Sequence, residues 1–185
     1  MDRNVHKYRG FTLSPVKDFS IFSGFSCCRP DDKDKDLDDF IHNDAENHLK
    51  NHMATTYILL LDPDLFQIPL SPLIPLGFVT LQNDSIKIKS DEYLYQSSPA
   101  VKIGRFGIEN IWQKRGLGSL ALTMVKQFML TDNRTGCRYI TLDAYNDGDV
   151  LKFYKKNGFS LLEKPNPKRD QVLMYFDLKS HPPKS

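Results

Sequence analysis

The chain has 185 residues, of which 40% are hydrophobic and 26% are charged, and its formal net charge is +2. This composition is that of a globular domain with a sizeable core, and it excludes a disordered or collagen-like chain. No apolar run is long enough to span a bilayer, the first residues lack the apolar stretch of a secretory signal, and the three cysteines form no disulfide framework. We therefore expect one cytoplasmic domain over residues 1–185, with reduced cysteines.

The charge is unevenly distributed along the chain. Residues 1–100 contain 10 Lys and Arg against 15 Asp and Glu, a net charge of −5, whereas residues 101–185 contain 15 against 8, a net charge of +7. This asymmetry fits a second half that receives phosphate groups. The alternative, an uneven surface charge without functional meaning, stays open at this point.

The first hundred residues are expected to form short strands and two helices. Leu37, Phe40, Ile41 and Ala45 recur at helical spacing after a run of aspartates at 31–36. Asn83 and Asp84 are typical of a turn, which would let a following strand pair back with its predecessor. The predicted strands are 8–13, 55–61, 77–81 and 86–88. The predicted helices are 16–25 and one that the aspartates at 31–36 open and that includes His48 and His52, and the predicted loops are 65–75 and 89–99.

Two features of this half could indicate a metal site, but neither has a metal-binding spacing. The aspartates at 31–36 do not follow the pattern of a calcium loop, and negative charge is stabilised at a helix start. His48 and His52 are four residues apart and share a helix face, but they lack the His-Glu-x-x-His pattern of zinc enzymes. We expect no metal.

The centre of the chain predicts a strand, a polar connector and a helix. An extended segment at 100–108 precedes a Gly-x-Gly turn, and apolar residues then recur at helical spacing from Leu117 to Met129. The first turn of such a helix has unpaired N–H groups and the positive end of the helix dipole. Gly116 and Gly118 let a bulky anion approach the backbone, and Lys114 and Arg115 add positive charge. The sequence predicts a phosphate cradle.

Two well-known phosphate-binding motifs do not explain this cradle. The P-loop pattern Gly-x-x-x-x-Gly-Lys-Ser/Thr is absent. Gly116-x-Gly118-x-x-Ala121 fits the dinucleotide fingerprint, but a basic connector separates it from the strand, and only 42 residues follow Asp143. A Rossmann domain is therefore disfavoured.

The remaining residues predict a strand at 139–142, a helix at 147–157 and strands at 159–162 and 172–177. Asn157-Gly158 ends the helix, and a proline-rich turn at 164–169 separates the last two strands. This order predicts an α/β (α+β) fold, a mixed sheet with helices on its faces.

Two motifs resemble those of the GNAT superfamily of N-acetyltransferases. The segment 113–118 resembles its Gln/Arg-x-x-Gly-x-Gly/Ala signature, and Asn146 followed by 153–159 resembles a second signature, an aromatic pair before Gly-Phe. The separation from Asn146 to Tyr154 is one residue longer than is usual in the family. The resemblance covers about 55–178, which leaves 1–54 as a helical segment on the acceptor side. It implies the GNAT fold, in which two central parallel strands splay apart to admit the cofactor.

The resemblance also implies the chemistry. Acetyl-CoA would be the co-substrate, without a metal, and its acetyl group would pass directly to a primary amine in a ternary complex. Tyr154 would donate a proton to the leaving sulfur, and none of the carboxylates Asp91, Glu92, Glu109 and Asp143 is singled out as a general base. The expected cofactor-binding residues are Phe106, Gly107, Ile108, Gln113, Lys114, Arg115, Gly116, Leu117, Gly118, Ser119 and Asn146.

The acceptor is left open by the sequence. Phe25-x-Cys27 and the segment 37–45 resemble the amino-terminal part of GNAT-type toxins, which acetylate the amino group of aminoacyl-tRNA. Charged tRNA is thus one alternative acceptor, beside a small-molecule or peptide amine, and no membrane partner is expected. A non-catalytic acetyl-CoA-binding module is another alternative, and a homodimer is neither indicated nor excluded.

Overall fold

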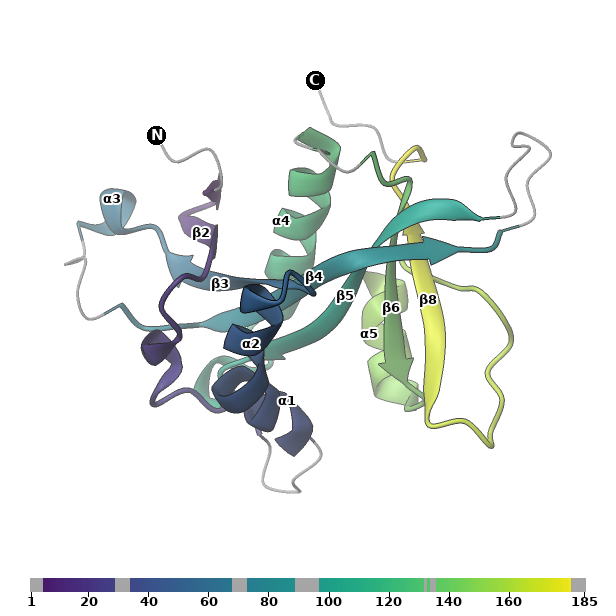
Figure 1. The fold of residues 1–185 in the computed structure, drawn as a ribbon, viewed down its shortest axis with the longest axis horizontal. Coiled ribbons are helices and arrows are strands. Elements are labelled where there is room, and N and C mark those ends of the chain that lie inside the picture. The colour runs from purple at the N-terminus through teal and green to yellow at the C-terminus, as the bar shows by residue number, and fades with distance from the viewer. Residues whose placement is uncertain are drawn as a thin grey trace. The chain divides into compact units, whose positions relative to one another are not determined.

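The computed structural model describes residues 5–28, 34–67, 73–88, 97–131, 133 and 136–180. They form two compact units. The first consists of the described residues up to Leu81 and of Arg105–Met124, and the second of the described residues of Gln82–Gly104 and those from Val125 onward. Eight strands are hydrogen-bonded in the order β1-β2-β3-β4-β5-β6-β8-β7, and strands β4 (Gly77–Ile86) and β5 (Ser98–Ile108) contribute to both units (Figure 1).

The first unit begins with antiparallel strands. β1 (His6–Tyr8), β2 (Phe11–Pro15) and β3 (Thr55–Leu61) pair in sequence, and β3 pairs with β4. The predicted single strand at 8–13 is wrong. Arg9 and Gly10 both have positive φ angles, 50° and 81°, and form the two-residue turn of a hairpin.

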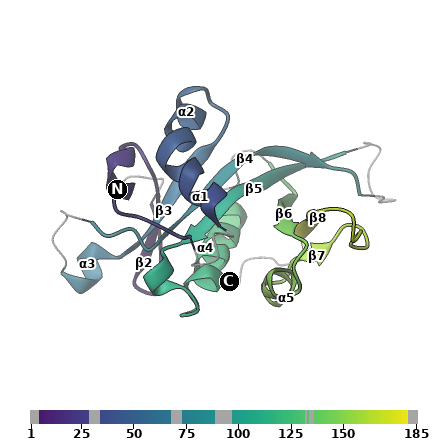
Figure 2. The same ribbon diagram turned by 90° about the horizontal axis from the view of Figure 1, so that it is seen from below.

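The helices of the first unit cover both faces of its strands. Helices α1 (Lys35–Asp39) and α2 (Ala45–Lys50) are joined by a π-helix at Phe40–Asp44, so the helix predicted after the aspartates is confirmed with a local widening. The prediction that His48 and His52 share a helix face is wrong, because the helix ends at Lys50 and His52 has a positive φ angle of 55°. They lie on one face of β3 and β4, and the start of α4 (Leu117–Thr131) lies on the other (Figure 2).

The predicted helix at 16–25 is wrong except for one 3-10 turn at Phe19–Phe22. Core packing decides the path of this segment, because the rings of Phe22, Phe25 and Phe78 are all within 5.5–6.1 Å of one another in edge-to-face contact. The predicted loop at 65–75 begins later than expected, since α3 (Pro63–Phe66), capped by Asp62, includes its first two residues. Residues 68–72 of that loop lie outside the described residues.

Strand β4 does not turn at Asn83 and Asp84, so the predicted turn and the separate strand at 86–88 are wrong. The strand continues to Ile86, and its exposed Asn83 and Ser85 alternate with more buried neighbours. The Asp84 carboxylate accepts hydrogen bonds from Thr141 Oγ1 at 2.5 Å and from the Ser85 N–H at 2.8 Å, so the polar side chain is satisfied within the strand. Of the predicted loop 89–99, residues 89–96 lie outside the described part, and Ser98 already belongs to β5.

The second unit confirms the predicted carboxy-terminal elements. β6 (Tyr139–Tyr145) pairs in parallel with β5, from Ala100 with Tyr139 to Ile103 with Leu142, and both strands continue beyond the last pair. On its other side β6 pairs antiparallel with β8 (Gln171–Asp177), which pairs with the short β7 (Ser160–Leu161). Helix α5 (Gly148–Lys156) is capped by Asp147 and lies beside β6 (Figure 1). The predicted mixed α/β sheet is confirmed.

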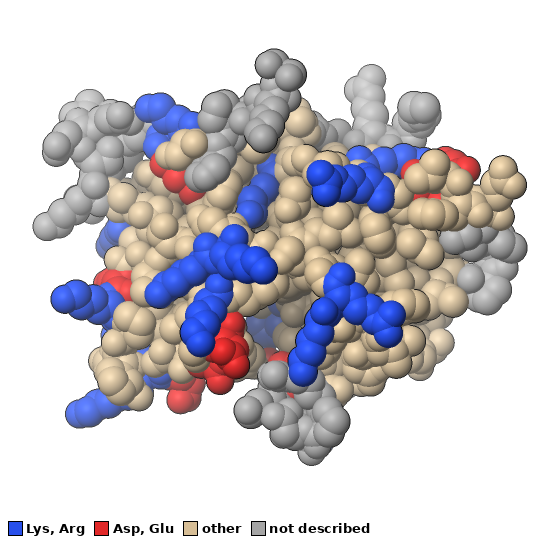
Figure 3. Space-filling view, turned by 180° about the vertical axis from the view of Figure 1, so that it is seen from behind, with Lys and Arg blue, Asp and Glu red and all other residues tan. Residues whose placement is uncertain are grey.

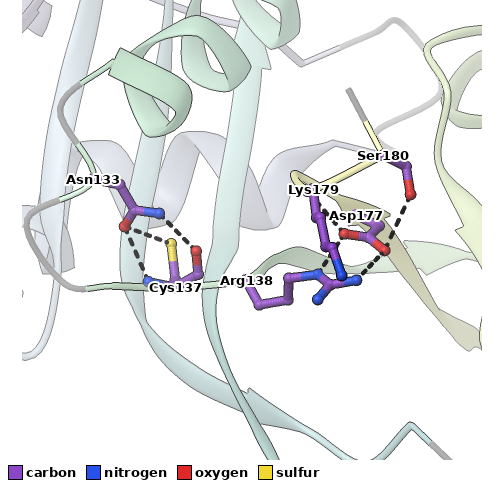
Figure 4. A network of polar contacts seen from close by, with 6 residues as sticks. All are labelled: Asn133, Cys137, Arg138, Asp177, Lys179 and Ser180. Atoms are coloured by element: carbon purple, nitrogen blue, oxygen red, sulfur yellow. Dashed lines mark hydrogen bonds and ion pairs between the residues drawn. The ribbon is translucent and has the colours of Figure 1, made fainter. Parts of the chain in front are cut away.

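Polar contacts fix one end of the β6–β8 pair, where Tyr139 is paired with Asp177. The Asn133 amide binds the backbone N–H and carbonyl of Cys137, and Arg138 makes two hydrogen bonds, of 2.7 and 2.8 Å, to the Asp177 carboxylate (Figure 4). The backbone N–H of Lys179 also donates to Asp177. The start of β6 is thereby tied to the end of β8.

In the part of the chain that the structure describes, no helix is long and apolar enough to cross a membrane. Among the same residues, no group of three or more His, Cys, Asp and Glu side chains is arranged to hold a metal ion.

Asp177→Asn should lower the free energy of unfolding by about 1–2 kcal/mol at pH 7, because it removes a partly buried, bidentate ionic hydrogen bond. Hydrogen bonding to Arg138 holds the pKa of Asp177 below its ordinary value. The contribution of Asp177 to the free energy of unfolding is therefore complete above its unfolded-state pKa near 4. It is lost as the pH falls through the lower folded-state pKa. Urea titrations at pH 7 and below pH 4 measure the difference. Asp149→Asn, at a 94% exposed side chain, is the control and should change stability little.

Candidate active site

The turn before helix α4 opens the helix amino terminus to solvent. Lys114 and Gly116 have left-handed backbone conformations, with φ angles of 59° and 86°. The Gly116 carbonyl accepts the first hydrogen bond of the helix, from the Leu120 N–H at 3.1 Å. A side-chain carbon placed on Gly116 would meet no atom of the described residues within 4 Å. Glycine is needed here for its conformation, and the space above it is open.

This turn has the properties of a site for a phosphate ester. The N–H groups of the first helical turn, which includes Leu117, Gly118 and Ser119, have no acceptor within an α-helix. Lys114 and Arg115 are exposed beside them, and the Arg115 guanidinium stacks over the Trp112 ring at 5.2 Å. Backbone donors, the helix dipole and two cations at an open glycine fit a diphosphate group.

Gln113, the first residue of the signature, holds the turn in place. Its side-chain amide donates hydrogen bonds to the carbonyls of Cys27 at 2.9 Å and of Ile108 at 3.0 Å. It thereby ties the end of β5 to the amino-terminal segment 25–28. In this structure the Gln113 amide group faces protein carbonyls, and its predicted contact with the cofactor stays a prediction.

Asp38 fixes the same amino-terminal segment from helix α1. Its carboxylate accepts hydrogen bonds from the Ser26 hydroxyl at 2.6 Å and from the Cys27 N–H at 2.8 Å. The Cys27 thiol also contacts this carboxylate, and burial, followed by the hydrogen bond to Asp38, raises the pKa of Cys27. Cys27 is thus a protonated structural group and no candidate nucleophile.

Glu109 is held by the same segment. Its carboxylate accepts the Ser26 N–H at 2.9 Å, and burial raises its pKa. The group therefore serves as a structural acceptor in this structure. Asp143, another carboxylate considered as a general base, forms an ion pair with Lys102 at 2.5 Å.

The predicted cofactor-binding residues 106–108 form the end of strand β5. A side-chain carbon at Gly107 would lie 2.8 Å from the Phe78 ring and 2.9 Å from Cys27 Sγ, so no larger residue fits. Phe106 and Ile108 are half-buried, and the Ile108 carbonyl is bound by Gln113. The close packing at Gly107 therefore fixes the course of the strand end.

Tyr154, the predicted proton donor, lies on α5 in the second unit. Its half-buried ring packs edge-on against the rings of Phe153 at 5.1 Å and Phe159 at 5.8 Å. Within the described residues its hydroxyl group has no hydrogen-bond partner. Burial, with a smaller contribution from Tyr145, raises the pKa of Tyr154. The phenol therefore keeps its proton across the physiological range, as a general acid must.

Asn146, at the end of β6, is held by the loop before β8. Its side-chain amide donates to the carbonyls of Asn166 at 3.1 Å and Arg169 at 3.0 Å, and its backbone N–H donates to Asp170. Both amide hydrogens are used by this loop, so only the side-chain oxygen is left for a ligand. Its predicted contact with the cofactor remains untested.

Lys126, on α4, was not singled out by the sequence. Its ammonium group donates to the Asn157 carbonyl and lies over the rings of Phe176 at 4.6 Å and Phe159 at 5.4 Å. Burial lowers the pKa of Lys126 to about 8. The sequence offers one sign that Lys126 is partly buried. It follows Leu122, which is buried, by four residues, and residues at this spacing share a helix face.

Comparison with solved structures identifies the fold. A tyrosine-to-phenylalanine mutant of KacT superposes with a TM-score of 0.72 and 18% identity, over 93% of this chain and 97% of that one. The chain has the GNAT fold. AtaT complexed with acetyl-methionyl-tRNAfMet gives a TM-score of 0.66 at 21% identity, over 92% of this chain and 96% of that one. AtaTR bound with AcCoA gives a TM-score of 0.64 at 21% identity, over 94% of this chain and 96% of that one.

The GNAT fold predicted from the two motifs is thereby confirmed. No protein-family model matches the sequence, and the comparison with curated proteins finds no significant match.

Gln113→Ala should lower the free energy of unfolding by about 1–3 kcal/mol, because it removes two hydrogen bonds and leaves two carbonyls to find other partners. Chemical denaturation measures this difference. Gln127→Ala, at an exposed position of α4, is the matched control and should stay within about 0.5 kcal/mol of the unmodified chain. Equal stability of the Gln113 and Gln127 variants would contradict the structural role of Gln113.

Proposed function

We propose that residues 1–185 form one acetyl-CoA-dependent N-acetyltransferase domain, acting on a primary amine in the cytoplasm. The observation that carries this proposal is the open, left-handed Gly116 before α4, which offers backbone donors to a diphosphate within a GNAT fold. A protonated tyrosine at the position of the family's proton donor supports the same function.

Each proposed residue has one task. Residues 113–119 bind the diphosphate of acetyl-CoA through backbone N–H groups and the charges of Lys114 and Arg115. The backbone of Phe106 and Ile108 pairs with the pantetheine amides as an added strand would. A backbone N–H of this strand end binds the thioester oxygen as negative charge develops on it.

The transfer itself is a direct attack in a ternary complex. The neutral amine nitrogen forms a bond to the thioester carbonyl carbon, the C–S bond breaks, and the leaving thiolate takes the phenolic proton of Tyr154. The new amide loses its extra proton to water, and Tyr154 regains a proton from solvent. A positioned general acid of this kind contributes roughly 10²–10⁴-fold to the rate.

Tyr154→Phe should leave the affinity for acetyl-CoA within about twofold and lower kcat about tenfold or more, because the ring stays and only the proton donor is removed. Calorimetry gives the affinity, and release of the coenzyme A thiol gives the rate. Tyr175→Phe, at a half-buried tyrosine of β8, is the control. Unchanged turnover in the Tyr154 variant would remove this residue from the mechanism.

Gly118→Asp should abolish acetyl-CoA binding while the chain stays folded. The substitution sets bulk and negative charge against the diphosphate, whereas an aspartate in the first turn of a helix is favoured by the helix dipole. Calorimetric titration and circular dichroism measure the two properties. Gly24→Asp is the control, because in the part of the chain that the structure describes a side-chain carbon placed on that exposed glycine would meet no atom within 4 Å. Retained binding by the Gly118 variant would refute the assigned diphosphate site.

Charged tRNA is the acceptor that we propose to test first. AtaT, which shares the fold over 92% of this chain, is seen in complex with acetyl-methionyl-tRNAfMet. Residues 101–185 have a net charge of +7, and Lys and Arg side chains are more prominent than acidic ones on the face seen in Figure 3. Positive charge of this kind favours a nucleic-acid ligand.

Labelled acetyl-CoA, incubated with the protein and a pool of aminoacyl-tRNA, separates the candidate functions. Label on the amino acid of the tRNA supports the toxin-like activity, and label only on small amines or peptides supports a general N-acetyltransferase. Acetyl-CoA binding without transfer to any acceptor would support the non-catalytic module. A heat-inactivated sample gives the background.

A further inference from the structure

Lys126 occupies an unusual place for a lysine. Its ammonium group is half-buried and lies over two aromatic rings, those of Phe159 and Phe176. Among the described residues no carboxylate pairs with it, and its one hydrogen bond goes to the carbonyl of Asn157. A lysine that only adds solubility would instead extend its ammonium group into water.

The hydrogen bond places a cation at the carboxyl end of helix α5. Asn157 follows the last helical residue, and its N–H donates to the carbonyls of Phe153 and Tyr154, at 3.1 and 3.0 Å. The Phe159 N–H also donates to the Tyr154 carbonyl, at 3.0 Å. A positive charge is stabilising at the end of a helix, where carbonyls lack partners. Lys126 thus holds the backbone turn whose N–H groups, those of Asn157 and Phe159, donate to the Tyr154 carbonyl.

A second connection runs through the ring of Phe159. This ring is almost fully buried, with its centroid 5.4 Å from the Lys126 ammonium and 5.8 Å from the Tyr154 ring. Phe176 packs against the same ring at 5.7 Å and is itself 4.6 Å from the ammonium. Cation–π attraction therefore holds the ring against which Tyr154 packs.

We propose that Lys126 is a positioning residue for Tyr154, acting through the Asn157 carbonyl and the Phe159 ring. It touches no reacting atom. Its charge fixes the backbone and the ring neighbour of the phenol, and so the direction of the phenolic O–H. This inference rests on the proposed role of Tyr154, because only then does the orientation of that hydroxyl group affect turnover.

The test compares Lys126→Met, Lys126→Arg and the control Lys152→Met, each with Tyr154 and with Tyr154→Phe. Methionine keeps the apolar stem without the charge, and arginine keeps the charge. Lys152 lies on α5 itself, with an 81% exposed side chain. Lys126→Gln, which keeps one N–H donor without the charge, replaces the methionine variant if that chain does not fold.

Two measurements are made on each full-length variant. The first is the NMR spectrum of protein labelled with ¹³C at the tyrosine hydroxyl carbon, in which loss of one signal in Tyr154→Phe assigns Tyr154. The second is kcat and KM for acetyl-CoA, from thiol release with an aminoacyl-tRNA pool as acceptor. The NMR measurement needs no substrate, so it tests the coupling of Lys126 to Tyr154 even where the proposed activity fails.

We expect Lys126→Met to shift or broaden the Tyr154 signal, to lower kcat about three- to tenfold and to leave KM within about twofold. Lys126→Arg should recover at least half of kcat, and Lys152→Met should match the unmodified chain. In the Tyr154→Phe background, Lys126→Met should lower kcat little further, because the effects of two substitutions that act through the same contacts are not additive. An unchanged Tyr154 signal, or an equal loss of kcat with and without the tyrosine, would overturn the inference.

Discussion

The proposed function depends on the exposure of one helix amino terminus, that of α4. The amino terminus of helix α4 is exposed because Gly116 takes a left-handed conformation that other residues rarely adopt, and because none of the described residues packs above it. Gln113 holds this turn through two backbone carbonyls, one from β5 and one from Cys27. Asp38 in turn fixes the segment around Cys27. The motif resemblance covers only about residues 55–178, yet in the structure the amino-terminal segment supports the turn before α4.

The second unit shows one physical cause acting on two side chains. Burial disfavours the charged form of any group, so it raises the pKa of Tyr154 and lowers that of Lys126 to about 8. For Tyr154 the result is a phenol that keeps its proton, as the proposed general acid must. For Lys126 the carbonyl of Asn157 and two aromatic rings compensate part of the lost hydration. Tyr154 and Lys126 both contact the ring of Phe159, so the packing of this ring connects the two side chains.

Local sequence signals predicted the elements whose periodicity agrees with their packing. The strand at 55–61, the helix after Gly116 and the helix ended by Asn157-Gly158 are of this kind. The turn expected at Asn83-Asp84 failed because a side chain distant in sequence, Thr141, satisfies Asp84 within a continuous strand. The supporting contacts of Gln113 could not be predicted for the same reason, since its partner Cys27 lies far away in sequence. Residue type indicates which groups need partners, but only the fold decides which partners they find.

The most direct test of the account is a calorimetric titration of the unmodified chain with acetyl-CoA and with S-acetylpantetheine, which lacks the diphosphate. If the α4 amino terminus binds the diphosphate, acetyl-CoA should bind at least about 100-fold more tightly than the shorter thioester, a difference of about 2.7 kcal/mol. Equal affinities would place the binding energy elsewhere, and a folded chain that gives no heat with acetyl-CoA would contradict the proposed function.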